Sequence, residues 1–209
     1  MTPSRPLLIA GLLALTLLAA TGSLLLGTVG LSLPRMIAVF AGHGDPVATT
    51  ILFDLRMPRT LLGLAVGAML GLAGAALQGY LRNPLAEPSV LGTSNAASLG
   101  AVAAIYFGLA GLHPVVLPLL AVSCAMVALV PLFILAGRSE SPLTLILAGI
   151  AIGTLATAGV SLALNLSPNP FAAMEIMTWL LGSLENRSFE HLWIALPCIV
   201  AGMALLLWD

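Results

Sequence analysis

The stretch that decides the fold runs from Arg56 to Ser98 and reads RMPRTLLGLAVGAMLGLAGAALQGYLRNPLAEPSVLGTSNAAS. Two arginines frame a proline at its start, and residues 60–81 that follow carry no charge. Because the ~30 Å hydrocarbon core of a bilayer takes about 20 apolar residues as helix, this run is predicted to span a membrane. A polar elbow follows at 82–88, where two prolines prevent the helix from running straight on.

The composition of the whole chain supports this interpretation. Of its 209 residues, 60% are hydrophobic and 7% are charged, whereas a soluble domain carries about 25% charged residues. The chain is therefore predicted to be an integral protein of the lipid bilayer. Its net charge of −1 gives no indication of nucleic-acid binding. All seven basic residues are arginine, so a Walker A phosphate loop, which needs lysine, is excluded.

Other apolar runs extend the pattern to about six transmembrane helices in one all-α polytopic domain over residues 1–209. The predicted helices are 6–33, 60–81, 91–112, 114–137, 143–166 and 191–208. A cleaved signal peptide ending near Ala20-Thr21-Gly22 is the alternative for the first run, but the apolar sequence continues well beyond that site. Residues 171–184 are too short to span and contain Glu175, so they are predicted to be interfacial or re-entrant.

Small residues recur at every fourth position of the run 60–81 and therefore share one helix face, which predicts close packing against a neighbouring helix. They are Gly63, Gly67, Gly71, Ala75 and Gly79. Gln78, near the end of this helix, is expected to bond a neighbouring helix. A similar stripe follows in the run 143–166, where it predicts either tight packing or a pore wall; it consists of Gly149, Gly153, Thr157 and Ser161.

The ionisable residues all lie in predicted connections or at their edges, and none is predicted in the middle of the membrane. Ion-coupled carriers usually need intramembrane acids or histidines, so this pattern disfavours a secondary carrier. Catalytic, cofactor-binding and metal-binding residues are not expected, since no catalytic motif is present and Cys124 and Cys198 each stand alone. A passive or externally powered translocation subunit is favoured, with a structural or assembly membrane protein as the alternative.

Ordered motifs across most of the chain resemble the FecCD-type permeases, the membrane subunits of ATP-binding-cassette importers for iron–siderophore, haem and cobalamin. The resemblance rests on Arg56-x-Pro58-Arg59, Gly67-Ala68, Gly74-Ala75-x-x-Gln78, Arg82-Asn83-Pro84-Leu85-Ala86-x-Pro88, Leu91-Gly92, Leu147-Ala148-Gly149 and Trp179-x-x-Gly182-Ser183-Leu184.

The resemblance implies partners and a location. Such permeases work as a homo- or heterodimer with two ATPase subunits, which hydrolyse the ATP, and with an extracytoplasmic substrate-binding protein. They have ten membrane helices in the inner membrane, with both termini cytoplasmic. An iron(III)-siderophore or related metal chelate is the expected substrate, with haem and cobalamin as alternatives. This chain ends at Asp209, before the coupling segment and the last four helices, so a fragment or truncated product that does not transport by itself is expected.

Residue roles are implied by the same resemblance. Arg56 and Arg59 would lie on the outer face and meet glutamates of the binding protein. The elbow residues Arg82, Asn83, Pro84 and Pro88 would lie on the cytoplasmic side. A cytoplasmic gate and part of the pore would fall on Ser141, Pro142, Leu143, Thr144, Gly149 and Gly153. Arginine counts alone leave the orientation open, because with a cytoplasmic N-terminus four of the seven arginines fall outside.

Overall fold

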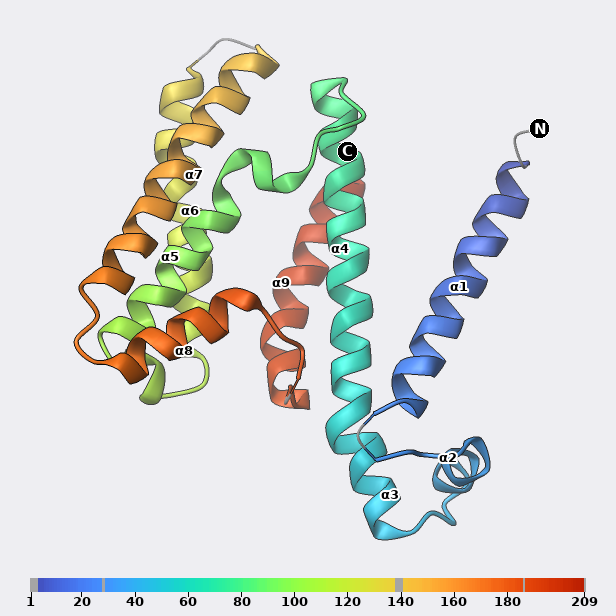
Figure 1. The fold of residues 1–209 in the computed structure, drawn as a ribbon. Coiled ribbons are helices and arrows are strands. Elements are labelled where there is room, and N and C mark those ends of the chain that lie inside the picture. The colour runs from blue at the N-terminus through green and yellow to red at the C-terminus, as the bar shows by residue number, and fades with distance from the viewer. Residues whose placement is uncertain (1–3, 28, 138–140, 186, 209) are drawn as a thin grey trace. The chain divides into compact units, whose positions relative to one another are not determined.

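The computed structural model describes residues 4–27, 29–137, 141–185 and 187–208 (Figure 1). The predicted fold class is confirmed, because these residues form helices joined by turns and loops, without a strand among them. Five of the described helices are long and apolar enough to cross a membrane. They are Arg5–Leu25, Pro46–Leu81, Val116–Ala136, Pro142–Asn165 and Phe189–Trp208.

The chain falls into two compact units, which are described separately. Unit 1 comprises Met1–Met69 with Leu184–Asp209, and unit 2 comprises Leu70–Ser183. Helix α4 (Met57–Leu81) begins in the first unit and ends in the second.

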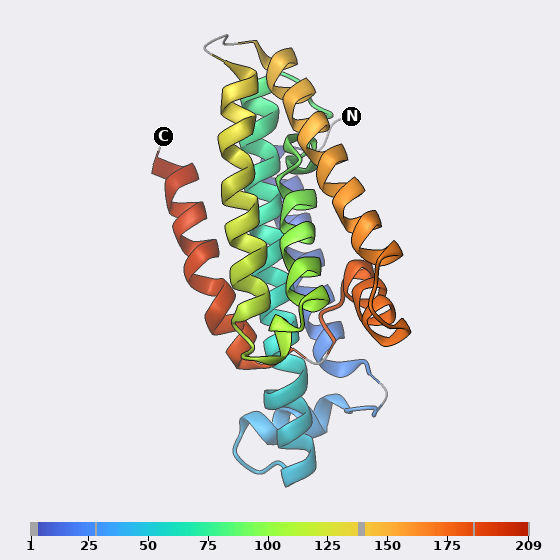
Figure 2. The same ribbon diagram turned by 90° about the vertical axis from the view of Figure 1, so that its left-hand side faces the viewer.

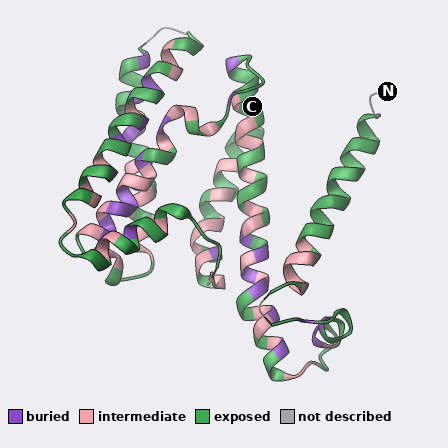
Figure 3. Cartoon of the chain, in the orientation of Figure 1, coloured by how far each residue is buried: buried purple, intermediate pink, exposed green. Residues whose placement is uncertain are grey.

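Unit 1 contains α1 (Arg5–Leu25), α2 (Leu33–Phe40), α3 (Pro46–Thr50), the start of α4 and α9 (Phe189–Trp208). None of the residues of α1 is buried, and Figure 3 shows this helix without a buried face. A hydrophobic cluster, which we call the α2–α3 cluster, is built instead from the segment after α1, where α2 is seen end-on in Figure 1. Its buried members are Leu31, Met36, Val39, Ala48 and Leu52.

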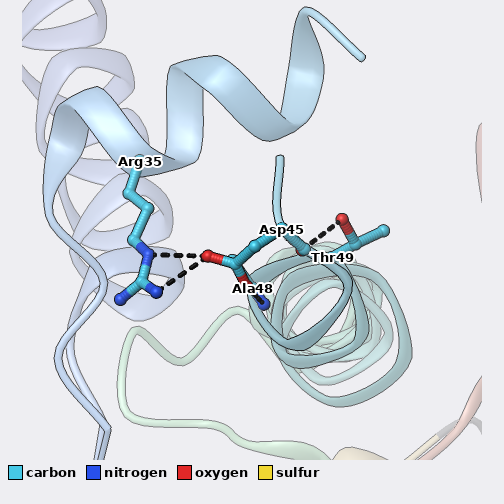
Figure 4. Close-up of polar contacts among 4 residues, drawn as sticks. All are labelled: Arg35, Asp45, Ala48 and Thr49. Atoms are coloured by element: carbon cyan, nitrogen blue, oxygen red, sulfur yellow. Dashed lines mark hydrogen bonds and ion pairs between the residues drawn. The ribbon is translucent and has the colours of Figure 1, made fainter. Parts of the chain in front are cut away.

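Asp45 organises the connection between α2 and α3 (Figure 4). Its Oδ1 accepts the backbone N–H of Ala48 at 2.7 Å, which caps the N-terminus of α3. Its Oδ2 accepts two bonds from the Arg35 guanidinium on α2, at 3.0 Å from Nε and 2.7 Å from Nη2. One carboxylate therefore fixes both short helices.

Helix α3 continues directly into a π-helical segment, η1 (Ile51–Arg56), and then into α4. The N–H of Met57 bonds the carbonyl of Leu52, five residues earlier, as the π geometry requires. The sequence predicts a polar connection over 35–59, in which residues 47–55 could form a short interfacial helix, and a membrane helix from Thr60. The structure instead has unbroken helix from Pro46 to Leu81. Asp54, Arg56 and Arg59 therefore lie within helix.

Unit 2 is built around α5 (Thr93–Tyr106), which packs against α6 (Val116–Ala136) and α7 (Pro142–Asn165). Figure 2 shows these three helices side by side. The short helix α8 (Pro170–Leu181) also contacts α5, and its Ile176 is fully buried. The buried core around α5 comprises Val102, Ile105, Val160 and Ile176.

The helix found within the predicted span 91–112 is shorter than that prediction. The 3₁₀ turn η2 (Pro88–Leu91) precedes α5, and Gly108 at φ +68° follows it, before a second 3₁₀ turn η3 (Leu109–Gly111). Glycine takes this left-handed conformation at no steric cost, so α5 ends there although apolar residues continue. At 14 residues, α5 is shorter than the bilayer core requires.

Candidate functional site

The first site is the end of α1, where Arg56 acts as a cap. Its side chain is 5% exposed, and Nη1 donates to the carbonyl oxygens of Leu24 and Leu25, each at 2.8 Å. Nη2 donates to the carbonyl of Val29. The last carbonyls of a helix lack intrahelical partners and carry the negative end of its dipole. Arg56 therefore satisfies the C-terminal end of α1 from the start of α4.

Close packing surrounds this cap. A Cβ at Gly27 would lie 2.6 Å from Nη2 of Arg56, so glycine leaves room for the guanidinium. The hydroxyls of Ser23 and Thr60 bond each other at 2.8 Å. Arg59 is half-buried and donates from Nη2 to the Ser23 carbonyl at 3.4 Å. Of the two arginines predicted to dock a partner, Arg56 is thus used within the chain, and the docking role of the pair stays a prediction.

The elbow is a helix terminus. Arg82 has a left-handed φ of +48°, its N–H bonds the carbonyl of Gly79, and the Asn83 N–H bonds that of Gln78. This pair of bonds is the Schellman motif, in which the left-handed position usually holds glycine. The Asn83 side chain then accepts the Leu85 N–H at 3.0 Å. Asn83 therefore shapes the turn through its own side chain.

Gln78 contributes to the same elbow. Its Nε2 donates to the Ala86 carbonyl at 3.3 Å, whereas the sequence predicts a bond to a neighbouring helix. Pro84 lies in the turn, and Pro88 opens η2. The elbow thus reverses the chain and delivers η2 to α7.

A groove of about 450 Å³, with hydroxyl and amide side chains among apolar ones, runs along α7, and we call it the α7 groove. Its lining comes from η2, α5 and α7 and comprises Ser89, Val90, Asn95, Gly149, Ile150, Gly153, Thr154, Thr157, Ala158 and Ser161. Asn95 links the helices, because its Nδ2 donates to the Gly153 carbonyl at 3.2 Å and to Oγ1 of Thr157 at 3.3 Å. The wall offers neutral hydrogen-bonding groups and no charged side chain.

Of the two uses predicted for the α7 stripe, close packing is seen at its first residues, and the pore wall stays a prediction. A Cβ at Gly149 would collide with the Val90 carbonyl oxygen and lie 2.8 Å from Cα of Leu91, so the first glycines serve close packing. Gly153 is likewise buried, with the amide of Asn95 beside it. Thr157 and Ser161, further along, are exposed and border the groove.

Sequence reasoning missed Asn95, Ser89 and Thr154 as lining residues of the α7 groove. Asn95 lies in the small polar stretch at 92–98, a signal that could have found it. Thr154 lies one residue after Gly153, and its hydroxyl donates to the Ile150 carbonyl at 2.8 Å. Its position on the groove depends on where Asn95 meets α7, which local sequence does not specify.

The predicted gate lies at the start of α7. Ser141 is the N-cap residue and Pro142 the first helical residue, a position where the missing N–H costs nothing. Leu143 is 65% exposed and Thr144 is half-buried, and neither lines the α7 groove. The preceding loop residues 138–140 lie outside the described part of the chain. The gate stays a prediction.

The small-residue face of α4 is largely open. A Cβ at Gly67, Gly71 or Gly79 would meet no described atom within 4 Å, whereas one at Gly63 would lie 3.3 Å from Cδ1 of Leu184. Ala75 on the same face is exposed. The packing role of this face stays a prediction.

Among the described residues, no group of three or more His, Cys, Asp or Glu side chains is placed to hold a metal.

Comparison with known proteins gives concordant results. A model of the FecCD transport family matches residues 12–208. The uncharacterized ABC transporter permease protein YvrB of Bacillus subtilis is 36% identical over 197 residues, covering 87% of this chain and 54% of that protein. The ferric enterobactin transport system permease protein FepD of Escherichia coli is 36% identical over 215 residues, covering 98% of this chain and 61% of that protein.

Two further matches extend this set. The molybdate import system permease protein MolB of Haemophilus influenzae is 34% identical over 194 residues, covering 90% of this chain and 57% of that protein. A solved structure described as a metal-chelate type ABC transporter in an inward-facing conformation superposes on this chain with a TM-score of 0.82 at 32% sequence identity. The match covers 97% of this chain and 62% of that one. The chain thus spans between 54% and 61% of the length of these three curated relatives.

Proposed function

Because this chain belongs to the FecCD transport family, we propose that it serves as a membrane-spanning permease subunit of an ATP-binding-cassette importer for an iron(III)-siderophore or a related metal chelate. Relatives named for ferric enterobactin and iron(3+)-hydroxamate transport support this substrate class. Cobalamin is the alternative supported by a relative named for vitamin B12 import, and haem remains a further alternative. Both units would belong to one permease domain.

The α7 groove is the observation that carries this proposal. It runs along a helix long enough to cross the bilayer, and exposed hydroxyls of Thr154, Thr157 and Ser161 line it. Polar groups at membrane depth are costly unless they face protein or a water-filled cavity. Neutral hydrogen-bonding groups would let a large polar chelate pass without trapping it by charge. We therefore assign α7 to the wall of the translocation pathway.

The proposed importer needs further subunits besides this chain. A second permease subunit would supply the opposite wall, two ATPase subunits would supply the energy, and a substrate-binding protein would deliver the chelate outside. Alternating access of the two permease subunits would move it inward. The N-terminus and the elbow at 82–88 would be cytoplasmic in the cell membrane, which would make the α1 end and the α2–α3 cluster extracytoplasmic.

Docking of the binding protein belongs to the same proposal, with unequal roles for the two arginines. Arg56 is held by carbonyls of the chain, so its role would be indirect, through the position of α1. Arg59 is half-buried and donates a long hydrogen bond, so we assign the direct contact with a partner carboxylate to its guanidinium. Arg59→Glu should weaken binding-protein affinity by about ten-fold, or ~1.4 kcal/mol. Arg5→Glu, at the opposite end of α1, is the matched control. Unchanged affinity of the Arg59 variant would refute direct docking there.

Cysteine accessibility tests the pathway assignment. In a Cys124→Ala, Cys198→Ala background, T154C and S161C should react with a membrane-impermeant thiol reagent roughly ten-fold faster than L155C and L162C, because thiolate forms readily only in water. Leu155 and Leu162 are exposed apolar residues of the same helix and are the matched controls. Equal reactivity of groove and control positions would contradict a pore wall. It would favour the alternative of a structural or assembly membrane protein.

A further inference from the structure

A second groove, within unit 1, lies between α1 and the start of α4. It has a volume of about 500 Å³, and we call it the α1–α4 groove. Its lining is apolar except around one guanidinium and three hydroxyls, and comprises Leu15, Thr16, Ala19, Ala20, Ser23, Arg59, Thr60, Gly63, Leu64 and Leu184. Neither the cap formed by Arg56 nor the α7 groove uses this space.

Helix geometry places the two ends of this groove at different membrane depths. At a rise of 1.5 Å per residue, Arg59 lies about 33 Å along α4 from Leu81, which is about the thickness of a bilayer core. Arg59 and Ser23 therefore lie at a headgroup level. Leu15 is about 12 Å further along α1 from Ser23, toward the middle of the bilayer. The groove thus has a polar mouth at the membrane surface and an apolar floor that extends into the hydrocarbon.

Arg59, at the mouth of the groove, has hydrogen-bond donors left over for a ligand. A guanidinium has five N–H donors, and in the part of the chain that the structure describes, that of Arg59 donates one hydrogen bond, to the Ser23 carbonyl at 3.4 Å. The Ser23 and Thr60 hydroxyls share one bond between them at 2.8 Å, so one hydroxyl proton of the pair stays available to another acceptor. Guanidinium forks match phosphate oxygens well.

We propose that the α1–α4 groove binds one anionic glycerophospholipid, with its phosphate at Arg59 and one acyl chain along Leu15, Ala19 and Leu64. A soluble anion would use only the mouth and leave the apolar floor uncovered. A carboxylate of a docked protein would reach the mouth but not the depth of Leu15. An amphiphile with an anionic head and an apolar tail satisfies both parts of the groove. Such a lipid would share Arg59 with any docked carboxylate, so the two ligands would compete.

Lipid retention by the purified chain tests this proposal without any binding protein, so its outcome is separable from that of docking. The 209-residue chain is delipidated in detergent and titrated with dioleoyl-phosphatidylglycerol, dioleoyl-phosphatidylcholine or soluble glycerol 3-phosphate, and bound lipid is counted by native mass spectrometry. One phosphatidylglycerol per chain should bind at least about five-fold more tightly than phosphatidylcholine, the factor equivalent to one arginine near a charged lipid surface. Glycerol 3-phosphate should not displace it.

Four variants test the location of the site. Arg59→Gln should remove the preference for phosphatidylglycerol, Arg59→Lys should keep it, and Arg5→Gln should behave as the unmodified chain. Ala19→Phe fills the groove while leaving Arg59 in place, and it should weaken binding of phosphatidylglycerol although the charge is unchanged. The proposal is overturned if Arg59→Gln binds phosphatidylglycerol as the unmodified chain does, if Ala19→Phe has no effect, or if glycerol 3-phosphate competes as well as the lipid. Exclusion of lipid by a second copy of the chain would overturn it equally.

Discussion

The guanidinium of Arg56 lies 2.8 Å from the carbonyl oxygen of Leu25, although 31 residues separate them in the chain. This contact joins the end of α1, a helix without a buried residue, to the segment that leads into α4. Because hydrocarbon tails are as apolar as leucine side chains, burial contributes little to helix association in a bilayer. The hydrogen bonds from the Arg56 guanidinium to the last carbonyls of α1 are therefore a principal attachment of this helix within unit 1.

Arg56→Gln should detach the end of α1. Hydrogen bonds from a charged donor are worth ~1.5–3 kcal/mol each, so losing this set should lower the free energy of unfolding by about 3 kcal/mol. Unfolding in mixed detergent micelles measures the loss, and limited proteolysis between α1 and α2 should become faster. Arg5→Gln, which carries the same charge change at the other end of α1, should leave both quantities unchanged. Equal stability of the two variants would show that the cap contributes nothing.

Gly149→Ala should separate α7 from η2. The added Cβ would meet backbone of Val90 and Leu91, which cannot rotate away as a side chain can. Overpacking of this kind costs about 1–3 kcal/mol, again measured by unfolding in detergent. Gly71→Ala in α4 is the matched control, because its Cβ would meet no described atom within 4 Å. The control should be neutral or more stable by up to about 1 kcal/mol through helix propensity, and the reverse ranking would contradict the packing role of Gly149.

Arg82→Gly should stabilise the elbow. A non-glycine residue in left-handed conformation costs roughly 1–2 kcal/mol, and Arg82 has φ +48° at the Schellman position. The free energy of unfolding of the glycine variant should therefore be higher by about 1 kcal/mol, as measured by denaturant unfolding in detergent. Arg82→Ala removes the same charge without relieving the strain, so it should show no such gain. If the alanine and glycine variants are equally stabilised, charge rather than backbone conformation is responsible.

Acid should loosen the connection between α2 and α3. The pKa of Asp45 lies below its ordinary value of 3.8, first because its carboxylate accepts the Ala48 N–H and then because it bonds the Arg35 guanidinium. A pKa lowered in the folded state adds stability that is fully present above the ordinary pKa and is lost as pH falls through the folded value. Proteolysis near Asp45 should accelerate as pH falls below about 4. Asp45→Asn keeps a cap but does not titrate, so its cleavage rate should depend less on pH; equal pH dependence would assign the effect elsewhere.

The long membrane helices were predictable because their signal is local. The uncharged run at 60–81 and the apolar runs predicted at 114–137 and 143–166 are each long enough to cover the bilayer core. The structure has helices at 116–136 and 142–165, whereas the helix through 60–81 begins earlier, at Pro46. The two prolines of the elbow likewise mark where α4 must stop. What could be predicted was therefore the position of the spans and the turn after α4.

Features that depend on distant partners were not predictable. In the sequence, Arg56 and Arg59 indicate the end of a polar connection, because arginine argues against helix at membrane depth unless a partner is known. That partner is the end of α1, brought close by the fold. The role of Asn95 depends in the same way on a contact with Gly153, 58 residues later. Neither pairing leaves a trace in local periodicity.

The π-helical segment Ile51–Arg56 holds one residue more per turn than an α-helix would accommodate. Each residue of an α-helix advances its face by about 100°, whereas a π turn spreads a full turn over about one residue more, so the wide turn absorbs the extra residue without shifting the helix faces on either side of it. Deleting one residue here would preserve an unbroken helix and its hydrophobicity. It would let the segment close as an ordinary α-helix, with Leu52 and the α2–α3 cluster close to their present angular position relative to the start of α4. A length change at this segment should therefore be tolerated better than one elsewhere in α4, where each residue turns the following face by about 100°.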